Sequence, residues 1–349
     1  MGTGITPGSD AYRRAGVDLD AAARAVSLIA DIAAGASRAG AADAVGGFAG
    51  RFDLGDGRTL VAATDGVGTK TEIARAAGRL DTVGIDLVAM CADDVVCTGA
   101  EPLFFLDYLA VGKVVAERVA ELVAGVAEGC RRAGCALLGG ETAEHPGLME
   151  EDQFDLAGFC VGVVDDATSI GPERVTAGDV LVGLAASGLH SNGFSLVREV
   201  IGRARLALDE RPEGLGGRSL AEALLEPTAV YAPLVAGLAR EGLVGAAAHV
   251  TGGGILENLP RALPPGLGAD LDPGAWTPPA VFDFVARTGG IPPADMWSTF
   301  NMGIGMMLVT RPDRAAEVVE RARASGHDAH VLGRVSAPEG VRLGGSRTS

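Results

Sequence analysis

Apolar and polar positions alternate in blocks along this chain of 349 residues, and the blocks have two different periods. Nearly continuous apolar runs bounded by turn residues predict strands at 60–64, 103–111, 135–138, 154–164, 180–186, 300–310 and 331–335. Helical spacing predicts helices from Asp18 or Asp20 to about Arg38, from the turn at 65–70 to Ala76, around 90–94, from Asn192 onward, and over 114–133, 219–241 and 312–325. Such alternation is typical of an α/β or α+β protein.

Two domains are expected from the length, because one domain holds roughly 150 residues. Turn residues gather over 168–178, around Pro172. We therefore predict an N-terminal domain of residues 1–172 and a C-terminal domain of residues 173–349. The stretch 264–293 is rich in loop residues.

Composition restricts the possible classes of function. Hydrophobic residues make up 48% of the chain and charged residues 21%, so the chain should fold around substantial cores. It carries 45 acidic and 29 basic residues, a net charge of −16, which disfavours a nucleic-acid-binding surface. Any anionic ligand should be held locally, by backbone amides, a metal ion or a few cations. The longest uncharged stretch, 180–197, contains several polar residues, so no membrane span is expected.

Cysteine spacing bears on the cellular compartment. The five cysteines form no Cys-x-x-Cys pair, and none lies near a histidine at zinc-finger spacing. Reduced thiols in a cytoplasmic protein are the simplest interpretation. These residues are Cys91, Cys97, Cys130, Cys135 and Cys160.

Glycine-rich turns are the main candidates for ligand binding. The chain has 52 glycines, and five glycine-rich turns adjoin expected strands or helices, at 46–50, 65–70, 139–142, 187–193 and 251–254. Glycine lets backbone N–H groups approach a phosphate closely, although ordinary turns need glycine too. Because these turns occur together with Asp65, Lys70 and His190, their pattern favours phosphate binding over a purely structural role. The known P-loop and dinucleotide-binding fingerprints are absent, as are the Gly-x-Ser-x-Gly and His-Glu-x-x-His motifs.

Acidic residues beside these turns suggest a metal. Asp65 ends a strand, Asp93 and Asp94 lie on an expected helix, and Glu141 follows two glycines. Oxygen ligands from separate segments suit Mg²⁺ that also contacts substrate phosphates. The alternative is that Asp65 caps a helix while Asp93 and Asp94 face solvent. The residue pattern leaves both interpretations open.

Several long strings closely resemble the phosphoribosylformylglycinamidine cyclo-ligase family, also called aminoimidazole ribonucleotide synthetase. The Asp-Gly-Val-Gly-Thr-Lys turn is shared across a wider superfamily of ATP-using enzymes, whereas Gly-Ala-Glu-Pro-Leu and Ser-Gly-x-His-Ser-Asn-Gly narrow the resemblance. The matching segments are Tyr12–Asp18, Thr64–Lys70, Asp81–Cys91, Gly99–Tyr108, Gly139–Glu144, Ala157–Gly162, Ser187–Gly193 and His249–Gly254.

The resemblance implies a reaction of purine synthesis. ATP would activate the formamide oxygen of formylglycinamidine ribonucleotide as a phosphate ester, and an internal nitrogen would close the imidazole ring. The products would be aminoimidazole ribonucleotide, ADP and phosphate. The resemblance also implies two α/β domains, a homodimer formed through the N-terminal domains, ATP in the cleft between domains, and Mg²⁺.

The resemblance further implies roles for individual residues. The catalytic residues would be His190, Asn192 and Lys70. Nucleotide and phosphate groups would be bound by Gly46, Gly47, Asp65, Gly66, Gly68, Thr69, Lys70 and Gly253. The magnesium ligands would be Asp65 and Asp94, with Glu141 a plausible addition.

Two positions depart from the family pattern. Many members have Lys where Arg13 stands, which changes the geometry of that cation, and Asp93 replaces a frequent Asn beside Asp94. The competing enzymes are superfamily relatives: formylglycinamidine ribonucleotide synthetase, selenophosphate synthetase, thiamine monophosphate kinase and the carbamoyl-dehydrating hydrogenase maturation enzyme. A nucleotide-binding scaffold without turnover is the alternative from another class.

Overall fold

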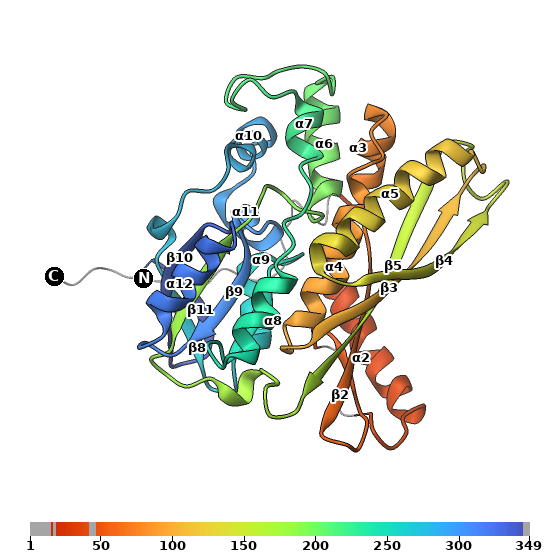
Figure 1. Ribbon diagram of the computed structural model, residues 1–349. Coiled ribbons are helices and arrows are strands. Elements are labelled where there is room, and N and C mark those ends of the chain that lie inside the picture. Colours follow the sequence, from red (N-terminus) through yellow and green to blue (C-terminus); the bar gives the residue numbers. More distant parts are fainter. Residues whose placement is uncertain (1–14, 17–18, 42–46, 345–349) are drawn as a thin grey trace.

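The structure, a computed structural model, describes residues 15–16, 19–41 and 47–344 and contains two β-sheets with helices packed on them (Figure 1). The first sheet has the strand order β1-β2-β5-β3-β4. Its β3–β4 pair is parallel and its other pairs are antiparallel. The strands are β1 (Gly50–Asp53), β2 (Arg58–Gly66), β3 (Glu101–Val111), β4 (Ala136–Glu144) and β5 (Phe154–Asp165).

Helices cover one face of this sheet. Helix α4 packs on β2, β3 and β5, and α5 packs on β3 and β4. The two helices approach very closely, because a Cβ atom on Gly84 would lie 2.2 Å from the backbone nitrogen of Val126. The helices of this half are α2 (Leu19–Gly35), α3 (Lys70–Ala77), α4 (Val83–Val96) and α5 (Ala116–Ala133).

The second sheet has six strands in the order β11-β8-β10-β6-β9-β7. Its strands are β6 (Val180–Ala185), β7 (Ala246–His249), β8 (Gly268–Leu271), β9 (Ile304–Thr310), β10 (Ala329–Ser336) and β11 (Gly340–Leu343). Its helices are α6 (Phe194–Ala204), α7 (Leu220–Leu224), α8 (Ala232–Arg240), α9 (Gly254–Asn258), α10 (Ala280–Gly289), α11 (Pro293–Thr299) and α12 (Ala315–Ala324). Short 3-10 turns lie at Pro172–Arg174, Leu259–Ala262 and Pro273–Ala275.

Helix α4 joins the two halves. Besides covering the first sheet, it contacts α8 and β7 of the second half. One hydrophobic core contains buried side chains from both halves of the chain, the first being Val61 and the last Ala329. A second core lies around β8 and α9. Side chains on α4 are therefore held between two packed layers, and acidic groups on this helix sit at the junction.

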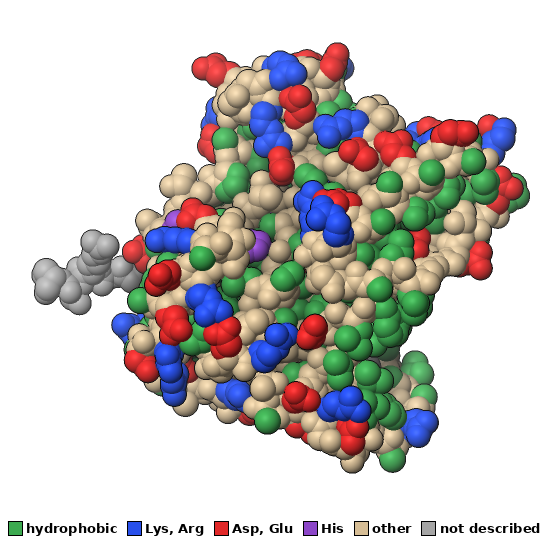
Figure 2. All heavy atoms as spheres, in the orientation of Figure 1, with side chains coloured by type: hydrophobic (Ala, Val, Ile, Leu, Met, Phe, Trp, Pro, Cys, Tyr) green, Lys and Arg blue, Asp and Glu red, His purple; other side chains and the backbone are tan. Residues whose placement is uncertain are grey.

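The other face of the first sheet carries exposed apolar side chains. Leu103, Tyr108, Leu138 and Phe159 are each at least 41% exposed. Alternation along β3 and β5 sends every second side chain to this face, so the exposure follows from strand geometry. Figure 2 shows hydrophobic side chains gathered over this sheet, toward the right of the view.

The predicted elements agree with the structure in most places. The helical stretch expected over 219–241 is an exception, because it is divided into α7 and α8. Residues 139–141 lie inside β4 and not in a turn, because β4 continues alongside β3 to Glu144. The stretch 264–293, although rich in loop residues, also contains β8 and α10. A further strand, β11, follows β10 and pairs with β8; it was not predicted. No helix in the described ranges is long and apolar enough to cross a bilayer. The domain boundary at residue 172 stays a prediction.

Candidate functional site

A cavity of about 290 Å³ opens where the end of β2 meets the turn before α6. Both halves of the chain contribute to its wall, since β2 belongs to the first sheet and α6 to the second half. Five of the predicted site residues line it: Asp65, Gly66, Gly68, Thr69 and Asn192. The other lining residues are Val67, Met90, Ser191, Gly193, Phe194 and Ser195.

Side-chain hydrogen bonds hold the two glycine turns of this cavity against each other. Ser191 Oγ donates to the carbonyl oxygen of Val67 at 2.7 Å. The hydroxyl oxygens of Thr69 and Ser195 lie 3.2 Å apart. These contacts cross 124 and 126 residues of sequence, so the cavity forms only when the two halves pack together.

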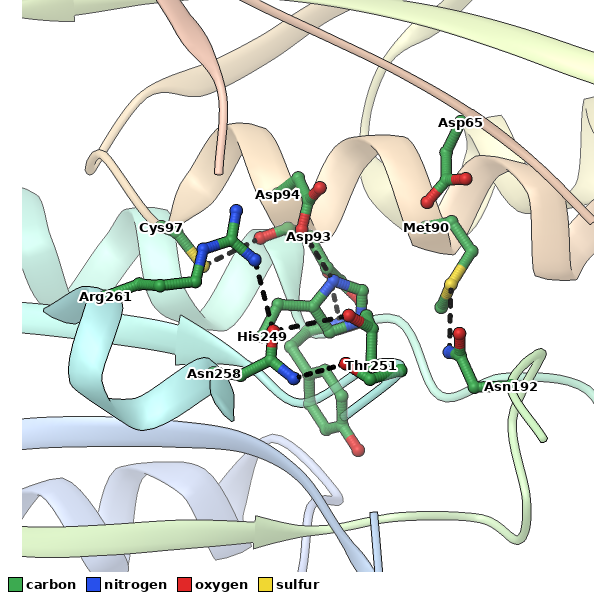
Figure 3. A network of polar contacts seen from close by, with 12 residues as sticks. Asp65, Met90, Asp93, Asp94, Cys97, Asn192, His249, Thr251, Asn258 and Arg261 are labelled. Atoms are coloured by element: carbon green, nitrogen blue, oxygen red, sulfur yellow. Dashed lines mark hydrogen bonds and ion pairs between the residues drawn. The ribbon is translucent and has the colours of Figure 1, made fainter. Parts of the chain in front are cut away.

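Asn192 is held at the wall of this cavity by a contact with α4. Its Nδ2 atom donates to Met90 Sδ at 3.7 Å (Figure 3). Its Oδ1 atom lies on the side of the 251–254 turn, since a Cβ on Gly252 would be 3.6 Å from it. The amide therefore lies between the first-half helix and the glycine turn that follows β7.

Asp65 and Asp94 form an acidic pair in the region shown in Figure 3. Asp65 Oδ1 accepts a hydrogen bond from the Gly66 N–H at 2.7 Å. Loss of hydration raises the pKa of Asp65, and the charge of Asp94 raises it further against the opposing effects of Gly66 and His249. Two carboxylates that repel in this way favour a bound cation.

His249 fixes the orientation of Asp94. Its Nδ1 atom lies 2.9 Å from Asp94 Oδ1, and the imidazole is wholly buried at the end of β7. Burial alone would lower the pKa of His249, but the hydrogen bond with Asp94 and the charges of Asp94, Asp93 and Asp65 outweigh burial and raise it. The sequence contained His249 only as part of a matching string, and its contact with Asp94 was not anticipated.

Asp93 does not face solvent, contrary to one interpretation of the sequence. It is completely buried, and its Oδ1 atom accepts the backbone N–H of Tyr231 at 2.9 Å. Burial raises the pKa of Asp93 to about 7. Its Oδ2 atom has no hydrogen-bond partner in the described part of the chain. Asp93 is therefore a buried junction residue, whereas Asp94, one residue on, keeps partial access to solvent.

Glu141 lies far from this acidic pair within one chain. The cross-strand row that contains Asp65 continues through Gly158 and Asp107 to Gly140. Three strand spacings separate its ends, or about 14 Å. The expectation that Glu141 joins Asp65 as a ligand of one ion is therefore not met within a single chain. Among the described residues, no three His, Cys, Asp or Glu side chains form a metal-binding group.

Lys70 is buried below the cavity and does not line it. Its Nζ atom lies 2.9 Å from Asp86 Oδ1 and also donates to the carbonyl oxygens of His190 and Glu226, each at 2.9 Å. Burial lowers the pKa of Lys70, and it raises the pKa of Asp86. With three acceptors around it, this ammonium group does not have the position that direct contact with a phosphate requires.

His190 is also buried, although the sequence suggested an imidazole at the reacting centre. The residue is 1% exposed, and Nε2 accepts the backbone N–H of Ser187 at 3.2 Å. Its backbone is left-handed, with φ 61°, and its ring packs near Tyr231. Burial lowers the pKa of His190 well below its usual value, and the charges of His249 and Lys70 act in the same direction. The imidazole is therefore neutral and turned into the core.

The remaining predicted glycines belong to a separate network. Arg261 Nη2 donates to the carbonyl oxygen of Gly47 at 2.7 Å, and Arg261 Nη1 donates to Asn258 Oδ1 at 3.1 Å. Asn258 Nδ2 in turn donates to the carbonyl oxygens of Gly252 and Gly254, which flank Gly253. The structure therefore connects Gly47 with the turn that contains Gly253, while Gly46 lies outside the described residues.

Relatives of known name match nearly the whole chain. A phosphoribosylformylglycinamidine cyclo-ligase from Shouchella clausii is 49% identical over 343 residues, covering 97% of this chain and 99% of the relative. One from Anaeromyxobacter dehalogenans is 52% identical over 330 residues, covering 93% and 95%. The chain belongs to the phosphoribosylformylglycinamidine cyclo-ligase family. Residues 46–164 and 176–345 of this cyclo-ligase family member match the N-terminal and C-terminal domains of the family described as AIR synthase related protein.

Solved structures share the fold of this cyclo-ligase family member at low identity. Thiamine-monophosphate kinase from Stenotrophomonas maltophilia has a TM-score of 0.62 and 18% identity, covering 90% of this chain and 94% of its own. Phosphoribosylformylglycinamidine synthase II from Thermotoga maritima has a TM-score of 0.60 and 19% identity, covering 86% of this chain and 44% of its own. At such identities the likeness concerns the fold alone.

The sequence of this cyclo-ligase family member did not single out two polar residues that the structure places in these networks, Asp86 and Arg261. Asp86 lies in an otherwise apolar helical run, a signal that it needed a buried cation. Arg261 follows a glycine turn and a proline, in a segment with no recognisable pattern. Only the fold brings Arg261 to Gly47, 214 residues away.

Proposed function

We propose that this chain catalyses the ATP-dependent ring closure of formylglycinamidine ribonucleotide to aminoimidazole ribonucleotide, with release of ADP and phosphate. The reaction belongs to purine biosynthesis. The observation that carries the proposal is the cavity at Asp65, in which two glycine turns from different halves of a cyclo-ligase family member face each other. A site built from both halves can hold two phosphate-bearing substrates side by side.

Backbone amides and small side chains are the groups proposed to bind phosphates. Gly66, Gly68 and Gly193 line the cavity without side chains that would keep a ligand away. Gly193 immediately precedes α6, whose first backbone N–H groups have no partner within the helix. An acidic chain can bind anions in this way without a large basic surface.

Mg²⁺ fits the acidic pair. Asp65 and Asp94 supply hard carboxylate oxygens. Loss of hydration, and to a smaller extent the charge of Asp94, raises the pKa of Asp65, and a bound cation would offset both effects. Mg²⁺ usually binds through one or two carboxylates and substrate phosphates, so two protein ligands suffice. Bound Mg²⁺ would neutralise charge on the transferring phosphoryl group. His249 would keep Asp94 oriented.

The remaining contributions come from the chain itself. Asn192 lies at the cavity wall and can donate or accept a hydrogen bond at the reacting atoms. The cavity would hold the amidine nitrogen near the activated formamide carbon, where proximity lowers the barrier to C–N bond formation. Phosphate then leaves with the former formamide oxygen. Lys70 and His190, which are buried and do not line the cavity, are proposed to hold the glycine turns in position.

A homodimer through the first sheet is proposed as the assembly. The face that carries Leu103, Tyr108, Leu138 and Phe159 is apolar and exposed in the single chain. Monomeric soluble proteins rarely keep such a continuous apolar sheet face in water. A second copy packed by twofold symmetry would cover it. A cytoplasmic location is also proposed, since all five cysteines are free thiols.

One assay tests the catalytic proposal. The purified chain is incubated with ATP and Mg²⁺, with and without formylglycinamidine ribonucleotide, and ADP and aminoimidazole ribonucleotide are both measured. We expect the two products to appear in equal amounts and only when the ribonucleotide is present. ATP hydrolysis that does not depend on the ribonucleotide would contradict the proposal, and nucleotide binding without any turnover would favour a scaffold.

A further inference from the structure

A second hollow, of about 560 Å³, lies between the start of α4 and the loop that leads into α7. It shares no lining residue with the cavity at Asp65. Its walls are formed by Arg79, Thr82, Arg211, Gly216, Gly217, Arg218, Glu222, Leu225, Glu226 and Pro227. The proposed cyclisation makes no use of this place in the fold.

Cations outnumber anions around this hollow, although the whole chain carries a charge of −16. Arg218 Nη2 bonds to Glu226 Oε2 at 2.5 Å, and Arg211 Nη1 bonds to Glu222 Oε2 at 3.1 Å. Each of these two carboxylates therefore neutralises one guanidinium. The third guanidinium, on Arg79, has no hydrogen bond or ion pair to any residue within the ranges that the structure describes. One positive charge is left for a ligand.

A buried hydroxyl at the same hollow also has no partner. Thr82 is 7% exposed, and its Oγ1 atom makes no hydrogen bond to any described residue. Thr82 precedes the fourteen-residue helix α4 and makes no side-chain capping bond to it. The N–H groups of Ile85 and Asp86 in the first turn of α4 already donate to the carbonyl oxygen of Thr82, at 3.0 and 3.3 Å. The helix dipole makes this end of α4 positive.

From these groups we infer that the hollow binds a phosphate monoester, with Thr82 Oγ1 and the Arg79 guanidinium as its donors beside the positive end of α4. A dianionic phosphate accepts several hydrogen bonds at once and matches the planar donor fork of arginine. A monoanionic carboxylate would leave part of this donor set unused. Inorganic phosphate has the same chemistry, so the experiment compares the two sources.

Calorimetric titration tests the inference with inorganic phosphate and ribose 5-phosphate as probes. Arg79→Gln should weaken binding of both probes at least about tenfold, the usual effect of losing a charged hydrogen bond. Thr82→Val should also weaken it, and the fold should persist because the Thr82 hydroxyl caps nothing. Arg203→Gln is the matched control, since Arg203 lies on α6, away from this hollow, and pairs with Glu199. If ribose 5-phosphate binds more tightly, the ligand is a phosphate monoester. If inorganic phosphate binds more tightly, the ligand is free phosphate.

A second variant and crystallography test whether the probes bind in the cavity at Asp65 instead of the second hollow. Binding should be retained in Asn192→Ala, which alters only the cavity at Asp65. Crystals soaked in tungstate, a phosphate analogue, should show anomalous density beside Thr82. Loss of binding in Asn192→Ala with full binding in Arg79→Gln would overturn the inference. So would tungstate density confined to the Asp65 cavity, or wild-type affinity in both Arg79→Gln and Thr82→Val.

Discussion

Lys70 Nζ and Asp86 Oδ1 lie 2.9 Å apart at a place where both side chains are completely shielded from solvent. The N–H and hydroxyl groups of Thr228 also donate to Asp86, at 2.8 and 2.6 Å. Lys70 and Asp86 come from the first half of the chain, whereas Thr228 comes from the second. The ion pair therefore belongs to the junction that forms the cavity.

Lys70→Met should destabilise the protein by about 3–5 kcal/mol, because it leaves the charge of Asp86 buried without a partner. The free energy of unfolding in urea measures this effect. The double variant Lys70→Met/Asp86→Leu should recover part of the loss, since it removes both charges. Lys113→Met is the control and should change stability by no more than about 0.5 kcal/mol, because its pair with Glu151 is exposed. If Lys70→Met keeps full stability but no longer binds ATP, Lys70 contacts phosphate directly.

His190 should make stability depend on pH below its usual pKa. Burial lowers the folded-state pKa of His190, so below about pH 6.5 the unfolded chain binds more protons than the folded chain. Stability should then fall as pH drops, by up to about 1.4 kcal/mol for each pH unit below 6.5. His190→Asn should remove this part of the slope, whereas His145→Asn, at a partly exposed position, should not. Identical pH profiles for the wild type and His190→Asn would contradict burial of a neutral imidazole.

His190→Asn also tests whether the imidazole transfers a proton. Asparagine tolerates the left-handed backbone at this position better than most residues, so it should keep the turn in place. We expect kcat to stay within about tenfold of the wild type, whereas loss of a general acid–base group typically costs a hundredfold to ten-thousandfold. Steady-state kinetics with the ribonucleotide measure the difference. A thousandfold fall in kcat with unchanged KM for ATP would restore the proton-transfer role that the resemblance implied.

Asp65→Asn should raise the Mg²⁺ concentration needed for half-maximal activity at least about tenfold, or abolish activity, because an amide lacks the charge that a hard cation requires. The fold should persist, since the amide oxygen can still accept the Gly66 N–H. Thermal melting checks the fold, and a Mg²⁺ titration of activity checks the metal. Asp93→Asn is the control and should be mild, because Asp93 is buried away from the cavity and the amide preserves the bond from Tyr231. Unfolding of Asp65→Asn with unchanged specific activity of the folded fraction would show that Asp65 is structural.

Phe159→Glu should convert the proposed dimer into a monomer. The variant places a charge in the centre of the apolar sheet face, where burial at an interface would be costly. Light scattering coupled to size-exclusion chromatography gives the mass directly. Val331→Glu, at a somewhat more exposed apolar position on the second sheet, should leave the mass unchanged. A wild-type monomer at micromolar concentration with full activity would exclude the dimer as a functional requirement.

Local pattern was enough to predict most elements of this fold. β3, β5, β6 and α5 were predicted close to their observed bounds. The three strands are mostly apolar runs with distinct ends, and α5 shows the helical period of an amphipathic helix. β8 and α10 were missed because prolines and glycines surround them. Their stability comes from packing and from pairing with strands distant in sequence, which no local window contains.

For the site, the sequence by itself determined which residues could carry phosphate and metal chemistry, and the tertiary structure decided which of them meet. Asp65, Gly68 and Asn192 come together because two hydrogen bonds join turns that lie more than a hundred residues apart in the sequence. One bond links Ser191 to Val67, and the other links Thr69 to Ser195. Lys70 and His190 are polar residues in glycine turns and were expected at the surface of the cavity. The packing of α4 between two layers instead buries them. Lys70 pairs with the buried carboxylate of Asp86 on this helix, and it also donates to the carbonyl oxygen of His190.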